Sequence, residues 1–279
     1  MAKPALNLAV YIGPTQTFET GWGSFSPTTS TLISGDKDAI LIDAQHIKND
    51  VKALGDMIAR SGKCLTTIYL THGHADHYYG IGELTHRFPT AKAVAVEGVA
   101  DFIEKDKNKA KQAWKNMFGD RVIDNDVFPT VIRNGLELEG HQLPIVEVGQ
   151  GDIENCTVLH VPAIDAVIPG DIVYNKVHMM LGLTTPDQWE LWIESIDQIE
   201  NLKPKIIVAG HKRPDMPDDE AQRMLDESRA YIRFFADTSK KAENEHELVA
   251  AVALRFPEFG NLWTLQFSAR QFFDRLRSA

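Results

Sequence analysis

A run of four potential metal ligands within six residues constrains this chain more than any other feature. The ligands are His72, His74, Asp76 and His77. They directly follow an apolar stretch, residues 67–70, which is typical of a buried strand. Neutral imidazole and carboxylate suit zinc and its first-row neighbours. One histidine alone is more often a hydrogen-bonded interior residue, but this density of ligands has few structural uses, so the run predicts a metal site.

The spacing within the run predicts two ions rather than one. Alternate side chains of an extended segment share a face, so His72 and His74 can bind the same ion. Asp76 and His77 follow one step later, where the strand gives way to a helix. We expect these two side chains to turn aside toward a second ion nearby.

The rest of the sequence alternates between predicted strands and predicted helices. The strands are expected at residues 6–12, 31–33, 39–42, 64–70, 93–96, 136–138, 145–148, 156–161, 166–168 and 205–208. The helices are expected at residues 48–61, 79–87, 99–118 and 186–199, with a helical segment beyond residue 218. The histidine-rich run therefore follows the carboxyl end of a strand, where open α/β sheets usually place their chemistry.

Composition narrows the classes of protein that this chain can be. Its 279 residues, of which 43% are hydrophobic, can build a substantial core, and we expect one catalytic domain. The net charge of −10 argues against nucleic acid or an anionic membrane as a partner. Neither a signal peptide nor a membrane span is predicted, so the expected location is the cytoplasm. The two cysteines, Cys64 and Cys156, adjoin apolar stretches and are expected to be buried thiols.

Three further loops carry a polar residue directly after a glycine. The pairs are Gly151-Asp152, Gly170-Asp171 and Gly210-His211. Glycine lets the backbone turn tightly and approach a metal closely. Each pair is weak evidence alone, but all three lie in or beside loops that border apolar strands.

Together with the His-x-His-x-Asp-His run, the order of these pairs resembles the metallo-β-lactamase superfamily over residues 6–211. The resemblance implies an α+β fold in which two sheets pack face to face with helices outside, a four-layer αββα sandwich. It also implies a catalytic domain at residues 1–214, followed by a helical C-terminal extension, residues 215–279, packed on the same domain. By the family's pattern, His72 and His74 hold the first ion. Asp76, His77 and His211 hold the second ion, and Asp171 bridges both.

One position departs from the family. Most members have Gly-His where this chain has Gly151-Asp152, and the surrounding pattern fixes the register, so the third histidine of the first site is missing. Neither His141 nor His160 falls at that place, and both are expected to be surface or strand residues. A carboxylate can also ligate zinc, so Asp152 is the predicted replacement; the alternative is a weak or empty first site.

The replacement changes the charge of the predicted centre. Two divalent ions with the three carboxylates Asp76, Asp152 and Asp171 leave a formal charge of about +1, against about +2 with a third histidine. We expect two ions, with zinc as the first candidate and manganese or iron as harder alternatives that the lower charge favours.

The paired centre predicts hydrolysis, because two ions can generate a bridging hydroxide near neutral pH and polarise a carbonyl. Asp76 is expected to orient the bridging water in addition to its ligand role. Tyr174 and His178, close in sequence to Asp171, are candidate donors to the tetrahedral oxyanion. An apolar substrate pocket is predicted from Trp22, Phe25, Met179 and Met180. Of the nearby basic residues, Lys176, Lys212 and Arg213 are expected to face solvent.

The leading hypothesis is a lactonase- or lactamase-like metallohydrolase that opens a small cyclic ester or amide. The alternatives are a thioester hydrolase of glyoxalase II type, a redox protein of flavodiiron type, and a metal-binding sensor without activity. A small molecule is the expected partner, and a homodimer is compatible with the sequence. The helices after His211 can cap the active site, mediate dimerisation or complete the core, because apolar helical spacing does not distinguish these roles.

Overall fold

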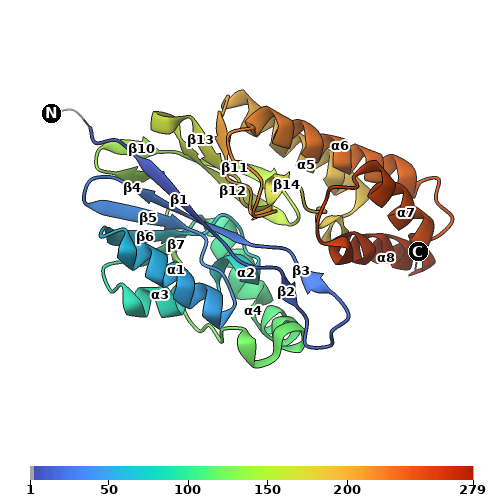
Figure 1. Ribbon diagram of the computed structural model, residues 1–279, viewed down its shortest axis with the longest axis horizontal. Coiled ribbons are helices and arrows are strands. Elements are labelled where there is room, and N and C mark those ends of the chain that lie inside the picture. The colour runs from blue at the N-terminus through green and yellow to red at the C-terminus, as the bar shows by residue number, and fades with distance from the viewer. Residues whose placement is uncertain (1–2, 279) are drawn as a thin grey trace.

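The computed structural model describes residues 3–278, and within them two large β-sheets lie against each other with helices on the outer sides (Figure 1). The strand order of the first sheet is β1 (Asn7–Ile12), β4 (Thr29–Ser34), β5 (Asp38–Ile42), β6 (Cys64–Tyr69), β7 (Lys92–Ala95) and β8 (Thr130–Val131). The strand order of the second sheet is β11 (Ile145–Gln150), β12 (Glu154–Val161), β13 (Ala166–Ile168) and β15 (Ile206–Ile207).

Shorter elements complete the architecture. Strand β2 (Gln16–Thr17) pairs with β3 (Ser24–Phe25), β9 (Leu136–Leu138) with β10 (His141–Leu143), and β14 (Tyr174–Asn175) with β16 (His211–Lys212). Short 3₁₀ helices are η1 (Gly119–Arg121), η2 (Pro162–Ile164), η3 (Gly170–Ile172) and η4 (Leu181–Leu183). Three of these elements, β14, β16 and η3, contain or closely follow the predicted ligands Asp171 and His211 in sequence.

The first sheet changes from antiparallel to parallel pairing at β5. Strands β1, β4 and β5 pair antiparallel, whereas β5, β6, β7 and β8 run parallel. Parallel neighbours need a crossover connection. The crossovers contain α1 (Lys48–Arg60), then α2 (Ala75–Tyr78) with α3 (Ile81–Arg87), then α4 (Glu97–Phe118). Since parallel strands end at the same edge of a sheet, the segments that follow β5 and β6 lie side by side there.

The alternation of side chains along β5 shows how the layers are held. Ile40 and Ile42 pack between the two sheets, in one buried cluster with Val161 of β12. Leu41 points to the other face and packs in a cluster with Leu54 of α1. This period of two buries both faces of the sheet, as expected of a central strand that is covered on each side. The predicted four-layer αββα sandwich is confirmed.

The C-terminal third of the chain is mostly helical. Its helices are α5 (Pro186–Asn201), α6 (Ala221–Ser239), α7 (Glu245–Arg255) and α8 (Leu262–Ser278). Helix α5 begins at Pro186, which has no N–H to leave unpaired, and Thr185 with Gln188 forms a capping box there. Trp192 of α5 and Phe235 of α6 belong to the same buried cluster as Val158 of β12. The helices beyond residue 214 therefore share their core with the second sheet.

The predicted helix at residues 79–87 begins two residues later than expected, as α3. The short helix α2 precedes it, and Gly80 lies between the two. A Cβ atom at Gly80 would lie 1.9 Å from the carbonyl oxygen of Ala44, and the Gly80 N–H donates to the carbonyl of Gln45. This close approach to the segment after β5 explains why the chain breaks its helical path here.

The expectation for the cysteines is correct for Cys156 and wrong for Cys64. Cys156 is buried, whereas Cys64 is exposed because it is the first residue of β6, at the strand's solvent-facing end. Both are free thiols in the described part of the chain. None of the helices formed by residues 3–278 combines the length and apolarity that crossing a bilayer requires.

Candidate metal centre

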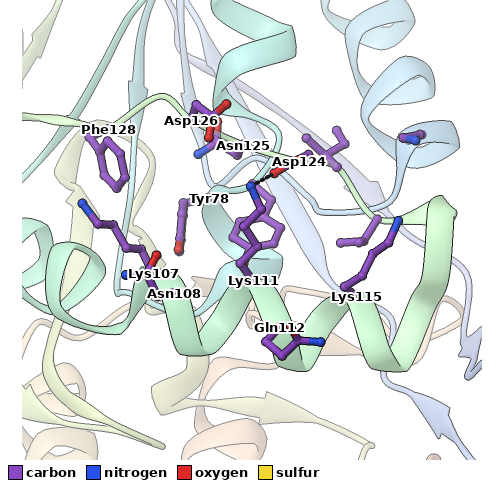
Figure 2. A pocket seen from close by; sticks show the side chains of 14 residues that line it. Tyr78, Lys107, Asn108, Lys111, Gln112, Lys115, Asp124, Asn125, Asp126 and Phe128 are labelled. Atoms are coloured by element: carbon purple, nitrogen blue, oxygen red, sulfur yellow. Dashed lines mark ion pairs between the residues drawn. The ribbon is translucent and has the colours of Figure 1, made fainter.

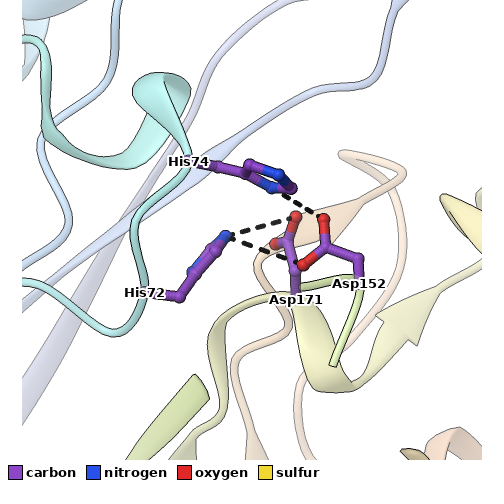
Figure 3. A group of neighbouring side chains, drawn as sticks. All are labelled: His72, His74, Asp152 and Asp171. Carbon is purple, nitrogen blue, oxygen red and sulfur yellow. Dashed lines mark ion pairs between the residues drawn. The ribbon is translucent and has the colours of Figure 1, made fainter. Parts of the chain in front are cut away.

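Four side chains from three separate segments meet at one edge of the sandwich (Figure 3). His72 and His74 follow β6, Asp152 lies in the turn between β11 and β12, and Asp171 lies in η3. His74 Nδ1 is 2.8 Å from Asp152 Oδ2, and His72 Nε2 is 4.0 Å from Asp152 Oδ1 and 3.7 Å from Asp171 Oδ2. One ligand atom from each of the four lies within 4.8 Å of the others, which is the spacing of a shared ion. Asp152 therefore stands where the sequence predicts a ligand.

Asp76, His77 and His211 form a second group beside the first. Asp76 Oδ2 lies 3.1 Å from His77 Nε2 and 3.3 Å from His211 Nε2. Asp171 contacts this group as well, because its Oδ1 is 3.2 Å from His77 Nε2 and its Oδ2 is 3.1 Å from His211 Nε2. All seven predicted ligands are thus brought together, and Asp171 lies between the two groups.

The polar atoms at the centre of this cluster have no hydrogen-bond partner among residues 3–278. They are His72 Nε2, His77 Nε2, Asp152 Oδ1 and Asp171 Oδ1, all buried. Burying a polar atom without a hydrogen-bond partner costs folding free energy, and native proteins contain few such atoms. Here they belong to nitrogen and oxygen ligands that converge on a common space. The donor set fits divalent cations, which would satisfy these atoms together.

Two glycines permit the close approach that the sequence predicted. Gly170 has φ +53°, and a Cβ atom there would lie 2.4 Å from Thr71 Oγ1. A Cβ atom at Gly210 would lie 2.1 Å from Asp171 Oδ1. Any larger residue at either position would displace the segments that carry the ligands.

Asp43 is a functional residue that the sequence reasoning missed. It follows β5 with φ +61°, and it accepts hydrogen bonds from the N–H of Thr71 (3.0 Å) and from Thr71 Oγ1 (2.9 Å). Its Oδ2 also lies 2.9 Å from His77 Nδ1, which fixes the ring so that Nε2 faces the cluster. The available signal in the sequence was an aspartate directly after the apolar strand 39–42, although its role depends on the parallel pairing of β5 with β6.

The other ligands are oriented by neighbours outside the cluster. Thr28 Oγ1 donates to Asp76 Oδ2 (3.1 Å), and the Tyr174 hydroxyl donates to Asp171 Oδ2 (3.2 Å). His211 Nδ1 is 3.2 Å from the carbonyl oxygen of Pro27, and the Tyr174 ring stacks on that of His211. Partners of this kind fix ring orientation and tautomer in metal sites.

The cluster shifts the pKa values of its histidines in opposite directions. Burial lowers the pKa of His72 well below its usual value, and the neighbouring His77 adds to this effect. Burial also acts to lower the pKa of His211, but the Asp171 and Asp76 carboxylates outweigh it and raise that pKa to about 10. The same two carboxylates outweigh burial at His77 and hold its pKa well above the usual value. Without a metal, the His211 ring is therefore protonated at neutral pH, and the pKa shift of His77 acts in the same direction.

Asp152 and His74 form a similar charge pair. Burial raises the pKa of Asp152 to about 6, with His74 opposing this effect and Asp171 adding to it. The pKa of His74 is raised in turn, because its contact with Asp152 outweighs its burial. Cations bound here would replace protons as the counter-charge for the carboxylates.

A cavity of about 590 Å³ opens over the cluster. This volume lies within the range of roughly 300–1,000 Å³ that is typical of small-molecule sites. Its floor includes the ligands His74, Asp76, Asp152, Asp171 and His211. Its walls come mainly from α4, from α8 and from the segment around η4.

The structure places only some of the predicted pocket residues in this cavity. Phe25, Tyr174 and Met180 line it. Trp22 and Met179 do not, because Trp22 lies at the tip of the β2–β3 hairpin with 87% of its surface exposed and Met179 is fully buried in the core.

His178 is also outside the cavity lining. Its Nδ1 lies 3.1 Å from the Tyr231 hydroxyl, and its ring packs against those of Tyr231 and Phe259. The side chain faces α6 rather than the cluster, so the structure does not bring it to the place of an oxyanion donor.

The basic residues near the ligands are ion-paired. The expectation that Lys212 faces solvent is wrong, because its side chain is buried and pairs with Asp218. Lys176 is mostly buried and pairs with Glu227 (2.6 Å), whereas Arg213 is partly exposed and pairs with Asp215. The lining of the cavity includes none of these three; its basic side chain is Lys109 of α4.

A second cavity, of about 560 Å³, lies on the opposite face of α4 (Figure 2). Its lining includes Lys107, Lys111 and Lys115, and each of these lysines pairs with a carboxylate, for example Lys111 with Asp124. The metal-ligand groups described above do not reach it. The chemistry of the cluster therefore belongs to the first cavity.

Comparison with known proteins gives this fold and centre a family. A model of the metallo-beta-lactamase superfamily matches residues 23–211 of the chain. The match spans more than half of the sequence and contains all the ligands, so the chain belongs to the metallo-beta-lactamase superfamily. Family and geometry together identify a metal-binding hydrolase.

Solved structures share the fold at low sequence identity. A metallo-beta-lactamase family protein from Thermus thermophilus is 19% identical with a TM-score of 0.68, and the match covers 97% of this chain and 93% of that one. A metallo-beta-lactamase from Pontibacter korlensis is 18% identical with a TM-score of 0.59, over 82% and 99% of the two chains. One from Hirschia baltica is 16% identical with a TM-score of 0.55, over 81% and 93%. The sequence comparison with curated proteins found no match.

Proposed function

We propose that this protein is a dinuclear metallohydrolase that opens a small cyclic ester or amide, a lactone or a lactam. The observation that carries the proposal is the position of Asp171. Its carboxylate contacts both ligand groups at the base of a cavity whose walls are largely apolar. A paired site of nitrogen and oxygen ligands without thiolate suits hydrolysis of a carbonyl compound.

The ligands would hold two divalent ions, with zinc as the first candidate and manganese or iron as alternatives. When bound, such ions supply an activated water and polarise the scissile carbonyl. The chain itself keeps the ligands in place: Asp43 holds Thr71 and His77, and Thr28 holds Asp76. Asp76 also faces the cavity, which is compatible with a further role in orienting water.

Tyr174 has a narrower role in this proposal than the sequence suggested. Its hydroxyl donates to Asp171 Oδ2, so that proton is engaged by a ligand. We therefore assign Tyr174 as a positioning residue that keeps Asp171 between the two ligand groups. Replacement by Phe tests this role, since a positioning residue affects metal affinity and an oxyanion donor affects kcat alone.

The charges of the cavity lining support this substrate class. Outside the ligands, Lys109 is accompanied by Asp106 and Glu154, so the lining offers no cluster of basic residues for a phosphate. Phosphodiesters and other polyanions are disfavoured by this arrangement. Neutral carbonyl compounds are favoured.

Turnover of a substrate panel tests the proposal. Zinc-loaded and manganese-loaded enzyme should hydrolyse lactones or lactams faster than phosphodiesters, and Asp171→Asn should lose that activity. The alternative, a thioester hydrolase of glyoxalase II type, uses the same site and predicts that thioesters lead the panel. Hydrolysis of no carbonyl substrate by either metal form would reject the enzyme proposal and favour a metal-binding sensor.

The role of Asp152 is tested by metal content. Wild-type protein is expected to hold two ions per chain, and Asp152→Ala to lose one of them, because the first group would keep fewer ligands. Asp152→His restores a neutral ligand and should retain both ions while shifting preference from manganese toward zinc. Elemental analysis showing unchanged stoichiometry in Asp152→Ala would remove Asp152 from the ligand set.

A further inference from the structure

Two helices from different parts of the chain, α4 and α8, both line the cavity. The apolar side chains of this part of the lining, which we call the apolar wall, are Phe102, Trp114 and Met117 of α4, Met180 beside η4, and Trp263 and Phe267 of α8. Helix α8 lies beyond residues 23–211, the part of the chain that the family model matches. The C-terminal helices thus contribute to the cavity directly, in addition to completing the core.

The α8 side of the apolar wall is held in place by its own contacts. The rings of Trp263 and Phe267 stack with centroids 5.2 Å apart, and Phe18 meets Trp263 edge-on at 4.7 Å. Gly23 lies against the same indole, since a Cβ atom there would be 2.3 Å from Trp263 Cδ1. Hairpin β2–β3 and helix α8 therefore form one packed surface beside the cavity.

Asn261, directly before α8, ties this helix to the hairpin. In the amide orientation that satisfies both polar atoms, its nitrogen donates to the Ser24 carbonyl (2.8 Å) and its oxygen accepts from the Ser26 N–H (2.9 Å). Asn261 has φ +60°, a conformation that asparagine tolerates better than most residues. A wall that is fixed before the ligand arrives loses little conformational entropy on binding.

We propose that the apolar wall binds a neutral apolar substituent of the substrate, an alkyl chain or an aryl ring next to the scissile carbonyl. This inference rests on the proposed function and names the substrate class of the same site. Trp114 and Trp263, which both line the cavity, contact that substituent, while the carbonyl lies on the ligand floor. Asp106 and Glu154 in the lining disfavour an anionic substituent. Trp263 and Phe267 are thereby specificity residues, and they take no part in the chemical step.

A series of γ-lactones with increasing alkyl substituents tests the inference. Each methylene that enters the apolar wall should raise kcat/KM of the wild-type enzyme by about fourfold, the effect of burying one CH₂ group. Trp263→Ala and Phe267→Ala should reduce this gain to below about twofold per methylene. Trp22→Ala is the matched control, because this exposed tryptophan lies outside the cavity lining.

A binding experiment separates this inference from the proposed function. Cyclic ethers with the same alkyl chains have no carbonyl to hydrolyse, and their affinity for the metal-loaded protein is measured by calorimetry. Affinity that rises with chain length in the wild type and not in Trp263→Ala supports the apolar wall, even when no lactone is turned over. If lactones are hydrolysed with a kcat/KM that does not change with chain length, the apolar wall does not bind the substituent. The proposed function is then unaffected.

The variants must keep their fold for these comparisons to count. Trp263→Phe retains an aromatic ring and should keep at least half of the chain-length gain, whereas Trp263→Ala should lose it. Metal content equal to that of the wild type shows that the floor is intact in both. If Trp263→Phe and Trp263→Ala both match the wild type along the series, Trp263 is no specificity residue.

Discussion

The floor and the walls of the cavity are built on different physical principles. The floor consists of carboxylate and imidazole side chains from the segments that follow the strands. Hydrogen bonds orient Asp76, His77 and Asp171, and several ligand atoms of the floor have no partner among the described residues. The walls consist of apolar side chains from two helices, held by ring packing. The floor therefore depends on directed contacts and on charge, whereas the walls depend on shape and on area removed from water.

This difference assigns metal binding and turnover to the floor, and the choice of substrate to the walls. Every ligand lies within residues 23–211, which match the family model, but half of the apolar wall's aromatic residues lie outside them. Changes in the floor should alter metal binding and turnover together. Changes in the walls should alter the choice of substrate and leave the metal content as it is.

Removal of Asp171 should have the largest effect. Asp171→Ala takes away the carboxylate that contacts both ligand groups, so we expect metal loss and a fall in activity of about a thousandfold or more, equivalent to several kcal/mol of lost stabilisation. Calorimetric binding of an alkyl-substituted cyclic ether should change little. If Asp171→Ala lost ether affinity as strongly as it lost metal, the walls would depend on the floor for binding.

Asp43 tests the floor from outside the ligand set. Asp43→Asn keeps the shape and tolerates the φ of +61°, but it weakens the hold on Thr71 and His77. We expect metal affinity to fall by about ten- to hundredfold, as for other supporting residues of metal sites. Competition with a chelator measures this metal affinity. Asp50→Asn is the control, because Asp50 is also a buried carboxyl but bonds to Tyr11 and Gln16 instead.

Metal binding should depend on pH, and binding to the walls should not. Carboxylates raise the pKa of His211 to about 10, so that ring carries a proton at pH 7 in the metal-free protein, and they shift the pKa of His77 in the same direction. Loading must release the His211 proton, and affinity should therefore rise by at least about tenfold per pH unit between pH 6 and 8. Calorimetry in buffers of different ionisation enthalpy counts the protons. Zero release would mean that the His211 ring is neutral before loading.

The same pKa shifts affect the stability of the metal-free protein. Because the folded-state pKa of His211 is raised, the stabilisation by its protonated ring is fully present below the unfolded pKa of about 6.5. It is lost as pH rises toward about 10. Metal-free protein should therefore lose thermal stability across that window, and metal-loaded protein should lose less.

Gly23 tests the walls with the smallest expected effect. Gly23→Ala places a Cβ atom against Trp263 and must push the indole aside, which should weaken binding of alkyl-substituted ethers by about three- to tenfold at unchanged metal content. Gly21→Ala is a close control, since Gly21 also has positive φ but a Cβ atom there meets nothing within 4 Å. Equal effects of the two variants would assign the loss to hairpin strain rather than to Trp263.

The sequence could predict the layers and the clustering of the ligand side chains because local motifs revealed the resemblance that implies both. Apolar alternation marks the strands, and ligand residues next to glycine mark strand ends, so even the unusual Asp152 falls in place. Asp43 escaped notice because its role depends on β5 lying parallel to β6, a pairing that no local pattern states. His178 and Lys212 were misplaced because packing against α6 and the ion pair with Asp218 decide where those side chains point.

The exposed position of Cys64 gives the protein a natural attachment point for a reporter. Cys64 starts β6, and the ligand-bearing segment follows the other end of that strand. Burial raises the pKa of the Cys156 thiol well above its usual value, which leaves it unreactive toward thiol reagents. A maleimide dye would therefore attach at one end of the strand while the opposite end remains free to take up metal. Fluorescence from that dye would follow unfolding of the first sheet without altering a single ligand.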